Sequence, residues 1–311
     1  GTTCFNDQYW FLPEAERAAE EMGMRSFQPF VILDLLDESK SEKIIQECVE
    51  SYDMSRNWSE RNKFAVGVHS PYSVSSGMLK WAGDFSRERG LLVHLHLSET
   101  LSENEDCIKR HGMTPARYLD SLGLLGPNVL AAHCLWIDDE DIPLLAERGV
   151  TVIHNINSNL KIASGYKFKY NEFKEAGIRV TLGTDGCASS NNLDMLETMK
   201  TSALVQKGWR RDPTAMPLNE LIELATVNGA SALGIKTGRI EEGYLADFSL
   251  LDVNNHAFTP NINFLANLVY SANSSCIDTV ICDGRVLMEN RKIDGEGEII
   301  REVNRLYRRL I

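Results

Sequence analysis

Several features that mark other classes of protein are missing from this sequence. It has no apolar run approaching the roughly 20 residues that a helix needs to span a bilayer, and no secretory signal opens it. Positive charge is scarce as well, because 32 lysines and arginines stand against 44 aspartates and glutamates, for a net charge of −12. This balance argues against nucleic acid or an anionic membrane as a partner. We therefore expect neither.

A disulfide framework is also not indicated. The seven cysteines are odd in number, scattered along the chain, and mostly inside apolar runs. That distribution is typical of buried thiols in a reducing compartment. We therefore predict a cytoplasmic protein.

Short apolar runs alternate with helical patterns along the 311 residues, and the 43% hydrophobic content suffices for a sizeable core. Alternation of this kind, with nearly continuous apolar strands, predicts a parallel sheet covered by helices. The predicted strands cover residues 2–6, 26–33, 64–69, 91–97, 129–132, 150–155 and 178–183. The helical patterns between them cover residues 13–22, 40–52, 74–89, 115–122, 138–148 and 169–176.

A barrel is favoured over a doubly wound sheet, because polar residues recur at the strand ends and no G-x-G-x-x-G turn is present. Two more helical patterns follow at residues 193–205 and 218–233. Beyond them the sequence predicts β segments at 238–252 and 279–288, the second a hairpin around Asp283-Gly284. We expect a barrel over residues 1–237, part of a small β domain with a connecting helix over 238–290, and a C-terminal helix over 291–311.

Histidines gather at the ends of the predicted strands. Side chains at these ends meet on one face of a barrel, although they are far apart in the sequence. Asp185 also follows a buried strand, where a carboxylate is costly unless it binds a cation or accepts several hydrogen bonds. Five of the seven histidines lie at such ends: His69, His94, His96, His133 and His154.

The segment HLHLSE at residues 94–99 carries the most specific chemical signal. Strand alternation places His94 and His96 on one face, and Glu99 falls just past the strand. A neutral nitrogen ligand and a nearby proton carrier are what a metal-activated water needs. A hydrogen-bonded core role also fits His94, and a structural role fits His154. His69 either contacts a substrate or is a satisfied buried histidine.

Together these motifs resemble those of the cytosine-deaminase-like branch of the amidohydrolase superfamily. GRIEEG at residues 238–243, leading to Ala246 and Asp247, is similar to the return into the β domain of that superfamily. Within the branch, two of the motifs look most like those of 5′-methylthioadenosine/S-adenosylhomocysteine deaminases: SNLKIASG at 158–165 and GTDGC at 183–187. The other matching segments are HSPY at 69–72, HLHLSE at 94–99 and AHC at 132–134.

The resemblance implies a (β/α)8 TIM-like barrel with a small β-sandwich domain, and a hydrolytic deaminase of an adenosine-type nucleoside. It implies one divalent metal ion, zinc or alternatively iron, held by His96 and Asp185. Glu99 would then protonate the ring and the leaving ammonia, Asp185 would take a proton from water, and His133 would orient that water. His69, with Glu99 and Asp185, would contact the substrate.

The sequence departs from the superfamily in one respect. The first strand of that superfamily normally carries a His-x-His pair that supplies two metal ligands, and no such pair stands before the strand at residues 2–6. The pair His94 and His96 cannot replace it, because the trailing Glu99 marks the fifth-strand motif. We therefore expect that an N-terminal segment with strand one and part of the β domain is missing from this sequence.

Other functions remain open. A guanine-type or pterin-type deaminase and a triazine-type chlorohydrolase share much of this pattern, and a non-enzymatic scaffold is a third alternative. Some adenosine-type deaminases of this branch carry arginines after the third strand, where they hold the distal part of the substrate. In the comparable region of this sequence no basic residue lies between Arg25 and Lys40, so the resemblance argues against a carboxylate-bearing substrate such as S-adenosylhomocysteine. The apolar residues 258–270 fit either a subunit contact in a homo-oligomer or a core helix.

Overall fold

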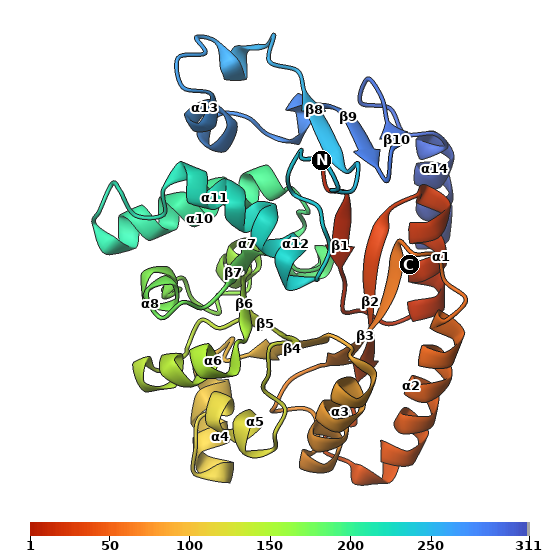
Figure 1. Cartoon of the computed structure of the whole chain (residues 1–311), viewed down its shortest axis with the longest axis vertical. Coiled ribbons are helices and arrows are strands. Elements are labelled where there is room, and N and C mark those ends of the chain that lie inside the picture. Colours follow the sequence, from red (N-terminus) through yellow and green to blue (C-terminus); the bar gives the residue numbers. More distant parts are fainter. Residues whose placement is uncertain (310–311) are drawn as a thin grey trace.

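A curved sheet of seven parallel strands dominates the computed structural model, which describes residues 1–309. The strands lie side by side in chain order, and helices surround the outside of the curve (Figure 1). All seven predicted strands are confirmed, with boundaries within two residues of those expected. The strands are β1 Cys4–Asn6, β2 Arg25–Ile32, β3 Asn62–Val68, β4 Val93–Leu97, β5 Val129–His133, β6 Thr151–His154 and β7 Val180–Leu182.

The predicted helices are also found, and the structure adds others. Leu101–His111 forms a helix that the sequence did not predict, because few of its residues are apolar. Residues 218–233, expected as one helix, form two that meet at Thr226. The helices up to this point are α1 Leu12–Met22, α2 Ser41–Ser55, α3 Ser76–Arg89, α4 Leu101–His111, α5 Pro115–Ser121, α6 Ile142–Arg148, α7 Ile156–Lys161, α8 Tyr170–Glu175, α9 Cys187–Ser190, α10 Met195–Arg210, α11 Leu218–Ala225 and α12 Val227–Ala232.

Strand β4 shows how the sheet separates the core from the site. Its alternate residues Val93, Leu95 and Leu97 are fully buried and belong to the large aliphatic core. His94 and His96, on the opposite face, are only partly buried. Because side chains alternate along a strand, one face of β4 stabilises the fold while the other presents imidazoles to the inside of the curve.

A second, antiparallel sheet of three strands follows in the order β10-β9-β8, at one end of the molecule (Figure 1). The expected hairpin is confirmed, with Asp283 and Gly284 both in the left-handed region at φ 53° and 73°. Within residues 1–309 these strands form a single sheet, so the expected sandwich of two sheets is not seen there. The strands are β8 Phe248–Leu251, β9 Ile277–Cys282 and β10 Arg285–Met288.

The remaining helices flank this small sheet. In α13, Phe264–Tyr270, Leu268 and Val269 are buried, so the core interpretation of this apolar segment is confirmed for both residues. The tail helix, predicted over residues 291–311, is shorter in the structure: α14 covers Glu296–Tyr307, while residues 310–311 lie outside the described part. Across residues 1–309, no helix combines the length and the apolarity needed to cross a membrane.

A buried ion pair joins the small sheet to the large one. Arg25, at the start of β2, donates from Nε to Asp247 Oδ2 at 3.0 Å and from Nη2 to Asp247 Oδ1 at 3.2 Å. The backbone N–H of Asp283 also donates to Asp247 Oδ1, at 2.7 Å. The Arg25 and Asp247 side chains are 6% and 0% exposed. The hairpin turn, the start of β8 and the start of the barrel strand β2 are thus fixed at one point.

Candidate active site

The predicted site residues meet at the carboxyl ends of the parallel strands. The ring centre of His96 lies 5.2 Å from that of His69, 5.4 Å from that of His133 and 6.0 Å from that of His94. Asp185, just after β7, is close enough for its charge to raise the pKa of His133 against the effect of burial. Residues from β3, β4, β5 and β7 therefore share one region.

His96 is oriented as a metal ligand would be. Its Nδ1 donates to the backbone carbonyl oxygen of His69 at 2.6 Å. That hydrogen bond places the proton on Nδ1 and leaves the lone pair of Nε2 available for a cation.

Asp185 is the second candidate ligand. Its Oδ2 accepts from Ser158 Oγ at 2.6 Å and its Oδ1 from the backbone N–H of Gly186 at 2.7 Å. Burial works to raise the pKa of Asp185, but these two hydrogen bonds and the neighbouring histidines lower it overall. The carboxyl group is therefore an anion at neutral pH.

These two donors fit a divalent ion, but they do not form a complete ligand set. Zinc is usually held by four ligands in structural sites, and by three plus water in catalytic ones. Among residues 1–309, no group of three or more His, Cys, Asp or Glu side chains is placed to hold a metal ion. The described chain therefore offers an imidazole nitrogen and a carboxylate as part of a metal site.

Glu99 lies between two groups that fix its carboxyl. Ser164 Oγ donates to Oε1 at 3.1 Å, and His133 Nε2 lies 3.7 Å from Oε2. Burial raises the pKa of Glu99 above its ordinary value. A carboxyl group in such surroundings retains a proton more readily than one in water, as a general acid requires.

His133 is neutral, and its Nδ1 is hydrogen-bonded to Asn159. The Asn159 side-chain amide lies 3.0 Å from its Nδ1. When this amide donates the hydrogen bond, Nδ1 is the acceptor, and the proton of the ring is on Nε2, toward Glu99. Burial, followed by the charge of His96, lowers the pKa of His133 to about 3. The ring can therefore donate a hydrogen bond into the site without carrying a charge.

The other three histidines have different surroundings. His69 Nδ1 lies 2.7 Å from Ser73 Oγ, and burial lowers the pKa of His69 to about 4. His94 Nδ1 lies 2.9 Å from the Asn6 amide, which agrees with a hydrogen-bonded role. The His154 ring stacks on Phe168 with 3.9 Å between ring centres, and neither of its nitrogens has a hydrogen-bond partner in the described part of the chain. The structural role expected for His154 therefore rests on stacking.

The backbone is strained at the strand ends that carry these groups. Ser98, His133, Cys134 and Asp185 adopt φ of 49°, 71°, 47° and 60°. Residues other than glycine rarely occupy this left-handed region, and such residues cluster at functional sites. Here these left-handed residues change the direction of the backbone where the strands end.

The sequence did not reveal the residues that orient the site. Ser158 contacts Asp185, Asn159 contacts His133, and Ser164 contacts Glu99. All three fall in the segment 158–165, which the sequence identified only as a motif. The structure forms α7 over part of this segment. The available signal for these orienting residues was a short run of small polar residues directly after β6.

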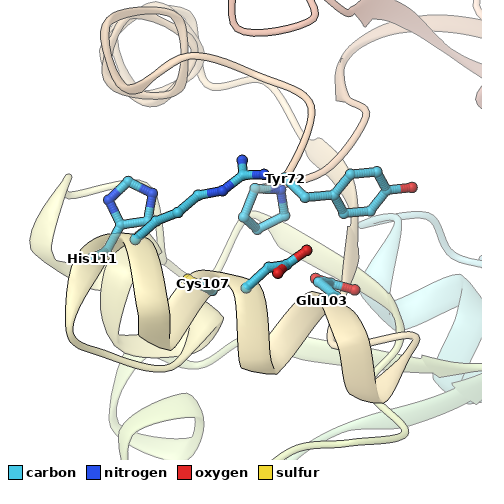
Figure 2. Close-up of a pocket in the computed structure, with 7 residues that line it drawn as sticks. Tyr72, Glu103, Cys107 and His111 are labelled. Atoms are coloured by element: carbon cyan, nitrogen blue, oxygen red, sulfur yellow. The ribbon is translucent and has the colours of Figure 1, made fainter.

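A small separate pocket lies beside α4. Figure 2 shows Glu103, Cys107 and His111 along this helix, facing the segment that carries Tyr72. None of the predicted site residues lines it. The remaining lining residues are Pro71, Asp106 and Arg110.

Comparison with known proteins agrees with this arrangement. The chain is 44% identical to a 5′-deoxyadenosine deaminase of Methanoregula boonei, over 100% of this chain and 71% of that protein. It is 42% identical to 5-methylthioadenosine/S-adenosylhomocysteine deaminase 1 of Archaeoglobus fulgidus, over 100% of this chain and 74% of that one. A zinc-bound crystal structure of an adenosine deaminase from Xanthomonas campestris superposes with a TM-score of 0.93 at 31% identity, covering 99% of this chain and 71% of that chain.

A model of the amidohydrolase family also matches this chain. It matches residues 1–287, which span both the curved sheet and the small antiparallel sheet. This match includes every strand end that contributes to the candidate site. The chain belongs to the amidohydrolase family.

Proposed function

We propose that this protein is a metal-dependent hydrolytic deaminase of an adenosine-type nucleoside, forming the inosine-type product and ammonia. The observation that carries the proposal is the placement of Glu99 Oε2 3.7 Å from His133 Nε2, beside the ligand pair His96 and Asp185. The substrate class is supported by the relatives at 42–44% identity, which are named for adenosine-type nucleosides.

The Nε2 of His96 and the carboxylate of Asp185 would hold the ion, for which we propose zinc, with iron as the alternative. Zinc is supported by the zinc-bound relative that is 31% identical. When bound, such an ion makes a water molecule acidic enough to act as a nucleophile near neutral pH.

The protein's own residues would move the protons. Asp185 accepts a proton from the water that attacks the amino-bearing carbon of the purine ring. Glu99 protonates the adjacent ring nitrogen and then carries a proton to the departing ammonia. His133 donates a hydrogen bond from Nε2, which orients the water and stabilises charge developing on its oxygen. His69 contacts the substrate. One water is consumed and one ammonia is released.

Among the nucleosides, we propose 5′-deoxyadenosine and 5′-methylthioadenosine rather than S-adenosylhomocysteine. S-adenosylhomocysteine carries a carboxylate that would need a cationic partner in the site. Arg25, the only basic residue among residues 25–39, is already bound to Asp247 and Asp283. It is therefore not available to a substrate.

Ammonia release by the native, zinc-loaded protein tests the proposal. The substrates to compare are 5′-deoxyadenosine, 5′-methylthioadenosine, S-adenosylhomocysteine, adenosine, guanine and a pterin. Turnover of the first two above the others supports both the reaction and the substrate class. Preferential turnover of guanine or a pterin would reject the adenosine class. Halide release from a chlorotriazine, measured in a parallel assay, would reject the deaminase if none of these compounds is deaminated.

We also propose a cytoplasmic location and the full (β/α)8 architecture of the family. The first is supported by the seven free cysteines, and the second by seven parallel strands in chain order. Thiol titration of protein taken directly from cells would check the first.

A further inference from the structure

We propose that Glu103 is a positioning residue for the reaction: it does not contact the substrate but fixes the backbone from which Glu99 reaches it. This inference rests on the proposed function, because it assigns Glu103 a role through the general acid Glu99. It concerns a carboxyl group outside the strand ends, in the first turn of α4.

Both carboxylate oxygens of Glu103 are used on the same short loop. Oε1 accepts from the backbone N–H of Ser98 at 2.8 Å, and Oε2 accepts from the backbone N–H of Glu99 at 2.8 Å. The residue is only 4% exposed. Two charge-assisted hydrogen bonds to adjacent peptide groups fix the loop in two directions.

The loop needs this support because its conformation is unfavourable by itself. Ser98 has φ 49°, in the left-handed region that residues with a Cβ rarely adopt. Its carbonyl oxygen accepts from the backbone N–H groups of Leu135 at 3.0 Å and Trp136 at 2.9 Å. The N–H side of the turn is bound by Glu103, and the C=O side is bound by the segment after β5.

Glu103 is itself held in place. Thr100 Oγ1 accepts from the Glu103 backbone N–H at 3.2 Å and caps α4. Figure 2 shows the side chain at one end of the pocket formed by α4 and the segment with Tyr72. The helix therefore presents a rigid bidentate acceptor to the loop.

The choice of a carboxylate here is not explained by stability. Burial raises the pKa of Glu103 to about 7, against the lowering effect of the backbone N–H groups of Glu99, Ser98 and Thr100. A buried carboxylate costs free energy that an apolar residue would not. What only the carboxylate offers is two acceptors, one for each N–H group.

A glutamine cannot replace this arrangement. In the present geometry the two N–H groups meet two different oxygens, and in glutamine an NH2 group takes the place of one of them and faces an N–H. The loop would shift to separate the two donors, and the Glu99 carboxyl would move with it. Displacements of about 1 Å in a catalytic group can cost on the order of 100-fold in rate.

Kinetics of the native, zinc-loaded protein test the role. We expect Glu103→Gln to lower kcat by about 10- to 100-fold with little change in KM. Glu105→Gln is the matched control, because Glu105 lies two residues along the same helix and is exposed. Glu103→Asp, which keeps two oxygens on a shorter side chain, should recover part of kcat.

A double variant separates positioning from a general loss of structure. If Glu103 acts through Glu99, adding Glu103→Gln to Glu99→Gln should cause little further loss of kcat. A further loss as large as in the wild-type background would overturn the proposal, as would an unchanged kcat in Glu103→Gln. If the wild-type protein releases no ammonia from any nucleoside, the proposed function fails instead.

Hydrogen exchange gives a readout that is independent of turnover. The backbone N–H groups of Ser98 and Glu99 should exchange at least ~10-fold faster in Glu103→Gln than in wild type or Glu105→Gln, and Glu103→Asp should lie in between. Unchanged exchange at both positions would show that Glu103 does not hold the loop.

Discussion

Three reactive side chains of the candidate site are each oriented by a neutral polar side chain. Ser158 holds Asp185, Asn159 holds His133, and Ser164 holds Glu99. Ser158 and Asn159 are fully buried, and Ser164 is 8% exposed. Because short side chains in a packed environment have few alternative rotamers, these contacts set the direction of the acid, the imidazole and the carboxylate before a substrate arrives.

The proton transfers predict the effect of two substitutions. Glu99→Gln removes the proposed ring acid, and Asp185→Asn removes the proposed acceptor of the water proton. Each should lower kcat by at least ~10²-fold. Ammonia release at saturating substrate measures the effect, with Glu105→Gln as the control. Near-normal turnover in either variant would remove that residue from the mechanism.

The contact between Ser158 and Asp185 predicts weaker metal binding when it is lost. Ser158→Ala should reduce zinc affinity by about 10- to 100-fold, because hydrogen bonds to a ligand orient it for the ion. Competition with a chromophoric chelator measures this affinity. Ser121→Ala is a suitable control, because the Ser121 hydroxyl donates to the Tyr118 carbonyl and lies outside the candidate site. Equal affinities in the two variants would contradict the prediction.

At the scale of elements, helix ends and turns decide how the chain reaches the site. Helix α4 has few apolar residues, yet Thr100 caps its start and Gly112, at φ 72°, ends it. Helices α11 and α12 meet at Thr226, whose backbone packs tightly against Gly238. Local capping and close backbone approach thus determine boundaries that apolar spacing does not predict.

Substitutions at two glycines measure how much the close approach of Gly238 to Thr226 matters for stability. Gly238 has φ 83°, and a Cβ there would lie 2.9 Å from the carbonyl carbon of Thr226. Gly234 has φ 69°, and a Cβ there would have nothing within 4 Å. Gly234→Ala should therefore destabilise the protein by about 1–2 kcal/mol from backbone strain alone. Gly238→Ala should cost more, because the backbone must also move.

Urea unfolding of the two alanine variants gives the comparison. Since both residues share a positive φ, the difference between the variants isolates the contact with Thr226. Equal loss of stability would show that this contact is easily relieved.

At the scale of the whole molecule, the Arg25–Asp247 pair joins the two sheets. Its side chains come from positions 222 residues apart and are almost completely buried. Arg25→Met leaves Asp247 without its cation and should lower the free energy of unfolding by about 3–5 kcal/mol.

The double variant Arg25→Met/Asp247→Leu should recover part of that loss, because no buried charge then remains unpaired. Arg17→Ala, at a side chain that is 70% exposed, is the control. Thermal or urea unfolding monitored by circular dichroism measures all three variants. A loss in Arg25→Met no larger than in Arg17→Ala would mean that the pair does not hold the sheets together.

The sequence by itself determined the order and type of the main elements and the chemistry at the strand ends. Seven apolar runs predicted β1 to β7, because the strands of a parallel sheet covered by helices are rich in apolar residues. His69, His96, Glu99, His133 and Asp185 were identifiable, because ionisable groups after such strands need a partner or a function.

Only the tertiary structure decided how these groups are held. The contacts of Ser158, Asn159 and Ser164, and the two hydrogen bonds of Glu103, join residues from different elements. The single three-stranded sheet and its ion pair with Arg25 likewise depend on long-range packing. Periodicity reports which face of an element is buried, but not which distant polar atom meets it there, and that choice sets the geometry of the site.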